Sequence, residues 1–169
     1  MPALIPLPNS IEWGTDHFLL TEQTAVGCAQ GASAEELEAA LGVRRLLSAT
    51  TGLLLPEGEE GIVVAFDPGL PAEGYRLEVC SDGVSIIAAD YRGAQWAAQT
   101  LLQLGPDDVY AVPLGKPLPL ATARIEDAPR FPRRGAMLDS SRHFVQFAEV
   151  LHFVDWLARH KLNVFHWHL

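Results

Sequence analysis

Strand-like and helix-like patterns of hydrophobic and polar positions alternate along residues 4–126. Three predicted strands cover residues 62–66, 75–79 and 84–88, and a shorter extended run lies at residues 18–20. The first is a continuous apolar run that ends at Asp67-Pro68-Gly69, a pattern typical of a buried strand. The turn sequence Ser81-Asp82-Gly83 joins the other two, which indicates a hairpin.

Two further segments have helical spacing. Ser33 and Glu36 have the arrangement of a capping box, in which the hydroxyl accepts from a backbone N–H and the carboxylate accepts from another. Apolar residues follow at helical spacing, and we expect this helix to end at Gly42. A second apolar face is formed by Trp96, Thr100, Leu101 and Leu104, closed by Gly105-Pro106. These elements predict an α+β domain with a mixed sheet and helices on one face.

The pattern changes after residues 127–132, where Pro129 and Pro132 disfavour both helix and sheet pairing. A short strand at residues 134–139 precedes an amphipathic helix at 147–158, and a second strand follows at 162–169. Strand, helix and strand in this order predict a parallel βαβ unit with a right-handed crossover. We therefore expect one domain over residues 1–127 and a second over 128–169.

Composition adds limits on partners and on the compartment. With 49% hydrophobic and 20% charged residues among 169, a packed core is expected. The net charge of −9, with no cluster of basic residues longer than a pair, argues against nucleic acid as a partner. No apolar run approaches the length of a membrane span, so no membrane partner is expected. The N-terminus does not have the pattern of a signal peptide, which makes the cytoplasm the default compartment.

The two cysteines, Cys28 and Cys80, have neither zinc-site spacing nor the pattern of a disulfide framework. Whether they pair with each other stays open at this point.

Polar residues gather where the two C-terminal strands end, which is where parallel α/β folds place their functional groups. His166 and His168 are two residues apart on one strand, so both rings point to the same side. They could bind one metal ion if a third ligand were available, or they could line a polar pocket and satisfy hydrogen bonds at the strand end. Trp167 points to the opposite side, where core packing is expected.

Arg142 follows the other strand and offers a rigid fork of donors. Such a fork suits a carboxylate, a phosphate or two adjacent sugar hydroxyls, but an ion pair with Asp139 explains it equally well. Asp139 is interpreted as an anchor for the strand end or for Arg142. Ser140 and Ser141 lack the surrounding glycines of a nucleophile elbow.

The two C-terminal strands also resemble a known family. Residues 130–144, Arg-Phe-Pro-Arg-Arg-Gly-Ala-Met-Leu-Asp-Ser-Ser-Arg-His-Phe, are similar to the opening strand of the barrel of family 20 glycoside hydrolases. Residues 157–169, which contain His166-Trp167-His168, are similar to the second strand. Upstream, the start at 5–8 and the segments 73–77 and 99–104 resemble the accessory α/β domain of that family.

The resemblance implies a retaining exo-β-N-acetylhexosaminidase that removes terminal N-acetylglucosamine or N-acetylgalactosamine from an amino-sugar glycan. In this family the acetamido oxygen of the substrate attacks the anomeric carbon, and neither a metal nor another cofactor is required. Arg142 corresponds to the arginine that binds the terminal sugar, and His166, His168 and Asp139 border the site. Ser140 stands where an aliphatic residue or threonine is commoner.

The resemblance also implies that the catalytic Asp-Glu pair lies beyond Leu169. A TIM barrel needs roughly 250 residues, so residues 128–169 would form only its incomplete β-α-β start. We expect the 169-residue chain to be an inactive fragment of the enzyme, whose partner is the remainder of its own barrel. Two alternatives are a non-catalytic carbohydrate-binding or interaction module, and a metal-dependent barrel hydrolase that uses His166 and His168.

Overall fold

The chain folds into two compact units, Met1–Pro129 and Arg130–Leu169, in a computed structural model that describes residues 2–111, 113 and 115–169. The first unit contains β1 (Ser10–Leu20), β2 (Ala25–Gly27), α1 (Ala34–Thr51), β3 (Gly61–Phe66), β4 (Tyr75–Val79), β5 (Val84–Ala88), α2 (Tyr91–Gln103) and β6 (Leu118–Asp127). The second contains β7 (Gly135–Asp139), α3 (Phe147–Arg159) and β8 (Val164–His168).

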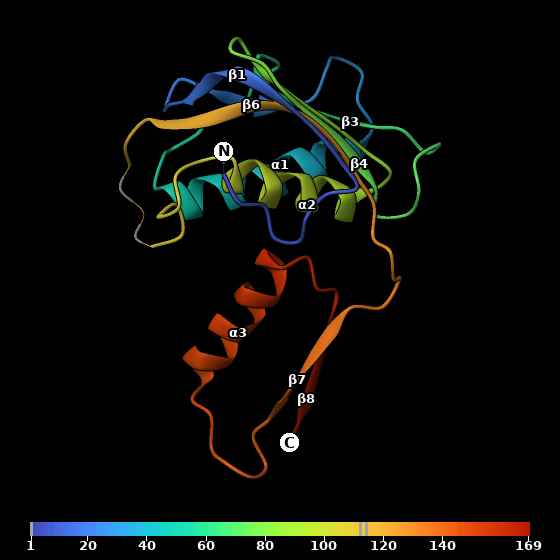
Figure 1. Ribbon diagram of the computed structural model, residues 1–169, viewed down its shortest axis with the longest axis vertical. Coiled ribbons are helices and arrows are strands. Elements are labelled where there is room, and N and C mark those ends of the chain that lie inside the picture. Colours follow the sequence, from blue (N-terminus) through green and yellow to red (C-terminus); the bar gives the residue numbers. More distant parts are fainter. Residues whose placement is uncertain (1, 112, 114) are drawn as a thin grey trace. The chain divides into compact units, whose positions relative to one another are not determined.

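The first unit is a six-stranded mixed sheet with both of its helices on one face (Figure 1), as the sequence predicts. The strand order is β1-β6-β4-β5-β3-β2. The pairs β1-β6, β6-β4 and β4-β5 are antiparallel, and β5-β3 and β3-β2 are parallel. The predicted hairpin is present, with Tyr75 opposite Ala88 and Val79 opposite Val84.

Two long strands extend beyond the predicted set. The run predicted at 18–20 is only the end of β1, and β6 was not predicted at all. Pairing between β1 and β6 is irregular between Trp13 and His17, so the apolar alternation of β1 is interrupted there. Thr122 fills this irregularity, because its hydroxyl donates to the Asp16 carbonyl at 2.9 Å and accepts from the Asp16 amide at 3.1 Å.

The first helix begins as predicted but ends later. The Ser33 hydroxyl accepts from the Glu36 amide at 3.2 Å, and Glu36 Oε2 accepts from the Ser33 amide at 2.8 Å. The predicted end at Gly42 is wrong, because the helix continues to Thr51 and ends at Gly52, where φ is +77°. A Cβ at position 42 would lie 2.7 Å from the Tyr91 hydroxyl, the end of a side chain of α2 that can turn away.

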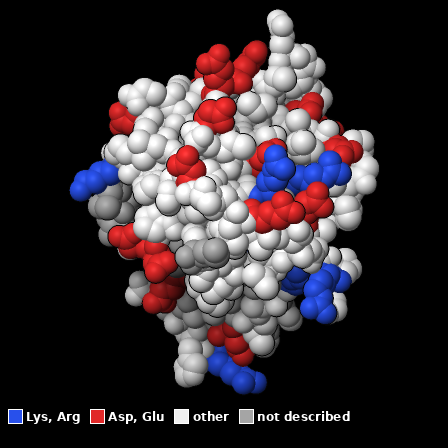
Figure 2. Space-filling model, turned by 45° about the horizontal axis from the view of Figure 1, so that its top comes forward, with Lys and Arg blue, Asp and Glu red and all other residues white. Residues whose placement is uncertain are grey.

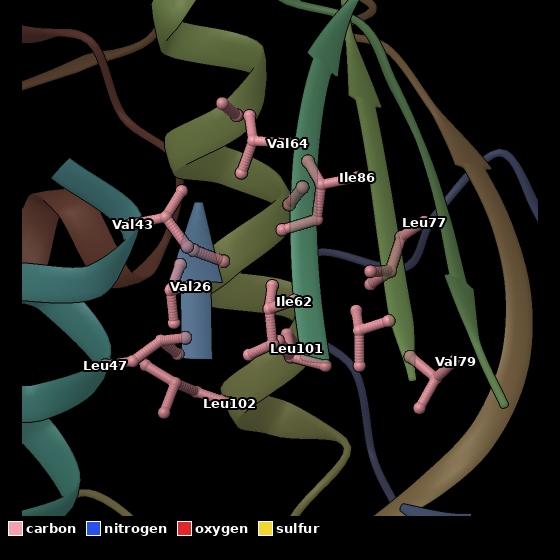
Figure 3. Packing of buried hydrophobic residues seen from close by; sticks show 14 of the residues in the cluster. Val26, Val43, Leu47, Ile62, Val64, Leu77, Val79, Ile86, Leu101 and Leu102 are labelled. Carbon is pink, nitrogen blue, oxygen red and sulfur yellow. The ribbon is translucent and has the colours of Figure 1, made fainter. Parts of the chain in front are cut away.

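The hydrophobic core of the first unit lies between the sheet and its helices (Figure 3). Ile62, Val64, Leu77, Val79 and Ile86 enter it from the sheet, and Val43, Leu47, Leu101 and Leu102 enter it from the helices. Each such side chain contributes about 1.5–3 kcal/mol of burial free energy.

The opposite face of the sheet carries paired charges, and Figure 2 shows basic side chains close to acidic ones on the surface. Arg124 contacts Glu78 at 2.7 Å through both Nε and Nη2, and Arg76 lies 3.4 Å from Asp67. The Glu78 carboxylate raises the pKa of Arg124. These contacts neutralise the basic groups locally.

Cys28 and Cys80 are both free, the first buried and the second exposed. Burial raises the pKa of the Cys28 thiol, with a smaller contribution from Glu36. Among the described residues, no helix has both the length and the apolar character needed to cross a bilayer.

In the second unit, strand, helix and strand follow one another as predicted, and β7 and β8 pair in parallel. The ring centroids of Phe153 on α3 and Phe165 on β8 are 5.7 Å apart, so one face of the two-stranded sheet packs against the helix. Apolar residues are spaced along α3 as expected, but of these Phe147 remains 71% exposed.

Candidate functional site

The parallel register of β7 and β8 collects the predicted site residues on one face. Met137 pairs with His166, and Asp139 pairs with His168. We call the face that carries these four residues the front face. The back face carries Phe165 and faces α3.

Asp139, the last residue of β7, organises the carboxyl end of the strand. Its Oδ1 accepts from the Ser141 hydroxyl at 2.8 Å, from the Ser141 amide at 3.1 Å and from the Arg142 amide at 3.2 Å. Its side chain is only 20% exposed. Asp139 therefore anchors both the strand end and Arg142, which confirms the interpretation of this residue as an anchor.

These hydrogen bonds also keep Asp139 ionised. The Ser141 hydroxyl makes the largest contribution to lowering its pKa, and the amides of Arg142 and Ser141 and the nearby His168 lower it further. Partial burial acts in the opposite direction but does not outweigh them. The front face thus holds a carboxylate beside Arg142.

Arg142 contacts Asp139 along one edge of its guanidinium group. Its Nε lies 3.3 Å from Asp139 Oδ2, while 82% of the side chain is exposed. The ion pair considered from the sequence is therefore present, and most of the group remains accessible to a ligand. A fork held at one edge suits two neighbouring acceptor oxygens.

His168 joins this cluster, whereas His166 lies beside it. His168 Nδ1 is 3.4 Å from Asp139 Oδ1, and 54% of its side chain is exposed. His166 is exposed on the same face, next to Met137. In the part of the chain that the structure describes, no group of three or more His, Cys, Asp or Glu residues is arranged to hold a metal ion.

The sequence interpretation missed two contacts at the strand end. The sequence suggested Ser141 only as a nucleophile, whereas in the structure its hydroxyl donates a hydrogen bond to the Asp139 carboxylate. The signal was available, because an aspartate commonly accepts from the backbone two residues later in an Asx turn. The second contact is between Ser140 and Trp167, where the Ser140 hydroxyl accepts from Trp167 Nε1 at 2.7 Å. The prediction of Trp167 as a core residue is wrong, because this residue is 40% exposed.

The opposite end of the strand pair is fixed by Arg134 and Asn163. The Arg134 amide donates to Asn163 Oδ1 at 3.0 Å, and the Asn163 amide donates to the Arg134 carbonyl at 2.8 Å. Asn163 Nδ2 also donates to the Pro132 carbonyl at 2.9 Å. The two strands are therefore joined by side chains at both ends of the pair.

Comparison with known proteins relates this arrangement to a family. The family model described as glycosyl hydrolase family 20, domain 2, matches residues 1–128, and the model of the catalytic domain of the same family matches residues 131–169. The first covers more than half of the chain. The chain therefore belongs to glycosyl hydrolase family 20.

Relatives in sequence and in structure agree with this assignment. A beta-hexosaminidase of Porphyromonas gingivalis is 35% identical over 98% of this chain and 22% of its own length. One from Vibrio furnissii is 34% identical over 99% of this chain and 26% of its own length.

Among solved structures, an exo beta-N-acetylglucosaminidase from Vibrio harveyi, in complex with N-acetylglucosamine, has a TM-score of 0.84 at 33% identity. The match covers 98% of this chain and 25% of that one. A Streptomyces plicatus N-acetyl-beta-hexosaminidase has a TM-score of 0.83 at 34% identity, with coverage of 100% and 35%. The chain therefore spans about a quarter to a third of the length of these relatives.

Proposed function

We propose that this chain is part of a retaining exo-β-N-acetylhexosaminidase and that Arg142 binds two adjacent hydroxyls of the terminal amino sugar. The observation that carries the proposal is the placement of an exposed arginine fork at the carboxyl end of β7, tethered by Asp139 and adjacent to His168. The Vibrio harveyi enzyme, which is similar over 98% of this chain, is described in complex with N-acetylglucosamine.

In this proposal residues 1–127 form the accessory domain, and residues 128–169 form the first β-α-β unit of a (β/α)8 barrel. The parallel pairing of β7 and β8, with α3 between them in sequence, has the form of such a unit. Barrel enzymes bind their substrates at the carboxyl ends of the strands, which is where Arg142 and His168 lie. The rest of the barrel is then the structural partner of this segment.

The chemistry divides between this segment and the rest of the enzyme. The substrate's acetamido oxygen attacks the anomeric carbon, while a glutamic acid protonates the leaving oxygen and an aspartate orients the acetamide. We assign those two acids to sequence beyond Leu169. Arg142 fixes the non-reducing end of the sugar, and Asp139, His166 and His168 form one border of its site.

Substitution of Arg142 in the complete enzyme tests the proposal. Hydrogen bonds that involve a charged group contribute about 1.5–3 kcal/mol each, so the loss of two in Arg142→Ala lowers kcat/KM by roughly 10²–10⁴-fold. Arg142→Lys keeps the charge but not the fork, so it restores only part of the activity. Arg133→Ala, at an exposed arginine in the same segment, is the matched control and leaves kcat/KM unchanged.

The assay is hydrolysis of a chromogenic N-acetyl-β-glucosaminide. Full activity of Arg142→Ala would refute the role of this residue. Hydrolysis by the purified 169-residue chain would refute the assignment of the catalytic acids to later sequence. If the complete protein bound the sugar without hydrolysing it, a carbohydrate-binding module would replace the enzyme as the better interpretation.

A further inference from the structure

The carboxyl ends of β7 and β8 are joined on the back face by Ser140 and Trp167. The Ser140 hydroxyl accepts from Trp167 Nε1 at 2.7 Å and donates to the His168 carbonyl at 3.2 Å. The Ser140 amide donates to the same carbonyl at 2.9 Å. We call these three hydrogen bonds the Ser140–Trp167 latch.

The latch lies directly behind the candidate sugar site. Ser140 is the residue between Asp139, which faces front, and Ser141, whose hydroxyl and amide both bond to Asp139. On β8, the carbonyl that Ser140 contacts belongs to His168, whose ring lies 3.4 Å from Asp139. Any movement of Ser140 away from β8 therefore disturbs both halves of the front-face cluster.

Trp167 is held in place for this contact. Its ring stacks on Phe165 with centroids 5.9 Å apart, and Phe165 contacts Phe153 on α3. The indole is thus supported from the helix side, while its N–H reaches across to the residue that follows β7. A tryptophan in this position has a hydrogen-bonding role that its packing alone does not explain.

We infer that Ser140 and Trp167 are positioning residues that set the geometry of Asp139, Arg142 and His168 from behind. The importance of this geometry for catalysis rests on the proposed function, in which Arg142 binds the sugar. The latch itself is a property of the strand pair and is measurable without any substrate.

The Arg134–Asn163 contacts at the other end of the same strands supply a control for general destabilisation. Asn163→Ala removes the bonds to the Arg134 amide and the Pro132 carbonyl. It weakens the strand pair at a point four residues from Trp167 and, through Arg134, six residues from Ser140, and leaves Ser140 and Trp167 unchanged. A purely structural effect of the latch would be reproduced by this variant.

The experiment compares Ser140→Ala, Trp167→Phe, Ser140→Thr and Asn163→Ala in the 169-residue chain by NMR. The measured quantities are amide exchange at Ser141 and Arg142 and the pKa of the Asp139 carboxylate. Loss of one hydrogen bond corresponds to a roughly two- to tenfold change in a local equilibrium. In Ser140→Ala and Trp167→Phe we expect exchange at Arg142 to quicken by that factor and the pKa of Asp139 to rise towards its ordinary value. Trp167→Phe keeps an aromatic ring beside Phe165 but loses the N–H donor and part of the indole surface, so the Ser140→Ala variant serves as the cleaner test of the hydrogen bond.

Ser140→Thr keeps the hydroxyl, so exchange and pKa remain as in the parent chain. Asn163→Ala lowers the stability of the unit but leaves the Asp139 pKa in place. The inference is overturned if Ser140→Ala leaves both readouts unchanged, or if Asn163→Ala shifts them equally. Because no sugar is used, these outcomes are independent of the Arg142 activity assay, and either proposal can fail while the other stands.

Discussion

The two units of this chain bury their apolar side chains to different extents. In the first, the side chains that point from the sheet towards α1 and α2 are almost completely buried, and Ile62, Val64 and Ile86 have no exposed surface. In the second, Phe147 and Trp156 of α3 are 71% and 52% exposed, and Met137 of the front face is 53% exposed. The candidate site residues lie in the second unit, which buries a smaller part of its apolar side chains.

The number of strands and helices in each unit explains the difference. Six strands and two helices enclose a core, whereas two strands and one helix leave the front face and much of the helix uncovered. Large exposed apolar surfaces commonly mark contacts with further protein. Stability and site geometry are therefore expected to respond to different substitutions.

The largest expected effect separates the two units directly. Ile86→Ala removes a fully buried side chain from the central part of the sheet and costs about 2–5 kcal/mol of unfolding free energy. Val154→Ala on the exposed side of α3 changes the stability by less than about 0.5 kcal/mol. Denaturant unfolding followed by circular dichroism measures both, and equal losses would contradict the comparison.

A second substitution tests the buried polar contacts of the first unit. The Tyr75 hydroxyl lies 2.7 Å from Thr100 Oγ1 and donates to Asp127 Oδ2 at 3.1 Å, and its burial raises the pKa of Tyr75 well above the ordinary value. Tyr75→Phe leaves these partners without this hydroxyl and costs about 1–3 kcal/mol. Tyr91→Phe, at a tyrosine that is 43% exposed, is the control and has little effect on the same unfolding curve.

A smaller effect is expected at the start of α1. Ser33→Ala removes the N-cap and costs about 0.5–2 kcal/mol. Hydrogen bonds from the Ser33 amide, then the Phe66 amide and then the Ser33 hydroxyl hold the pKa of Glu36 below its ordinary value, and Ser33→Ala removes only the last of them. The carboxylate therefore adds stability above that ordinary pKa, and the contribution is lost as the pH falls through the folded-state pKa. The difference between parent and Ser33→Ala should narrow between pH 7 and strongly acidic pH, and a constant difference would contradict this account.

The smallest expected change in stability occurs at the strand end of the second unit. Ser141→Ala removes the hydroxyl that contributes most to the lowered pKa of Asp139. The free energy of unfolding changes by less than about 0.5 kcal/mol, because this is an exposed position. The pKa of Asp139 nevertheless rises, which carboxylate NMR titration detects. A large loss of stability without a pKa change would show that the site and the fold of this unit cannot be perturbed separately.

The elements that the sequence predicted correctly are those whose apolar pattern is uninterrupted. Ile62 to Phe66 and the hairpin around Gly83 belong to this group. Only the end of β1, at residues 18–20, was predicted, because the pairing of this strand is irregular between Trp13 and His17, where Thr122 contacts it from β6. The end of α1 was misplaced because no local pattern distinguishes a glycine within a helix, such as Gly42, from one that ends it, such as Gly52.

For the site, residue spacing placed His166 and His168 on one face, and the resemblance to the family selected Arg142. The ion pair between Asp139 and Arg142 is three residues apart in sequence and was considered there. The contact of His168 with Asp139 was not, because it depends on the register between two strands. The roles of Ser140 and Trp167 depend on the same register. Residue spacing predicts which side chains of a strand share a face, but it does not predict how the strand is aligned with its neighbour.

This register has a consequence for insertions and deletions. A slip of β8 by one residue would place the indole of Trp167 on the front face and both imidazoles against α3. Length changes at residues 143–146, which follow Arg142 and precede α3, can be absorbed by that loop itself. A single residue gained or lost within β7 or β8 moves the following side chains of that strand from one face of the strand pair to the other. Among homologous chains, length variation in this segment should therefore be confined to its loops.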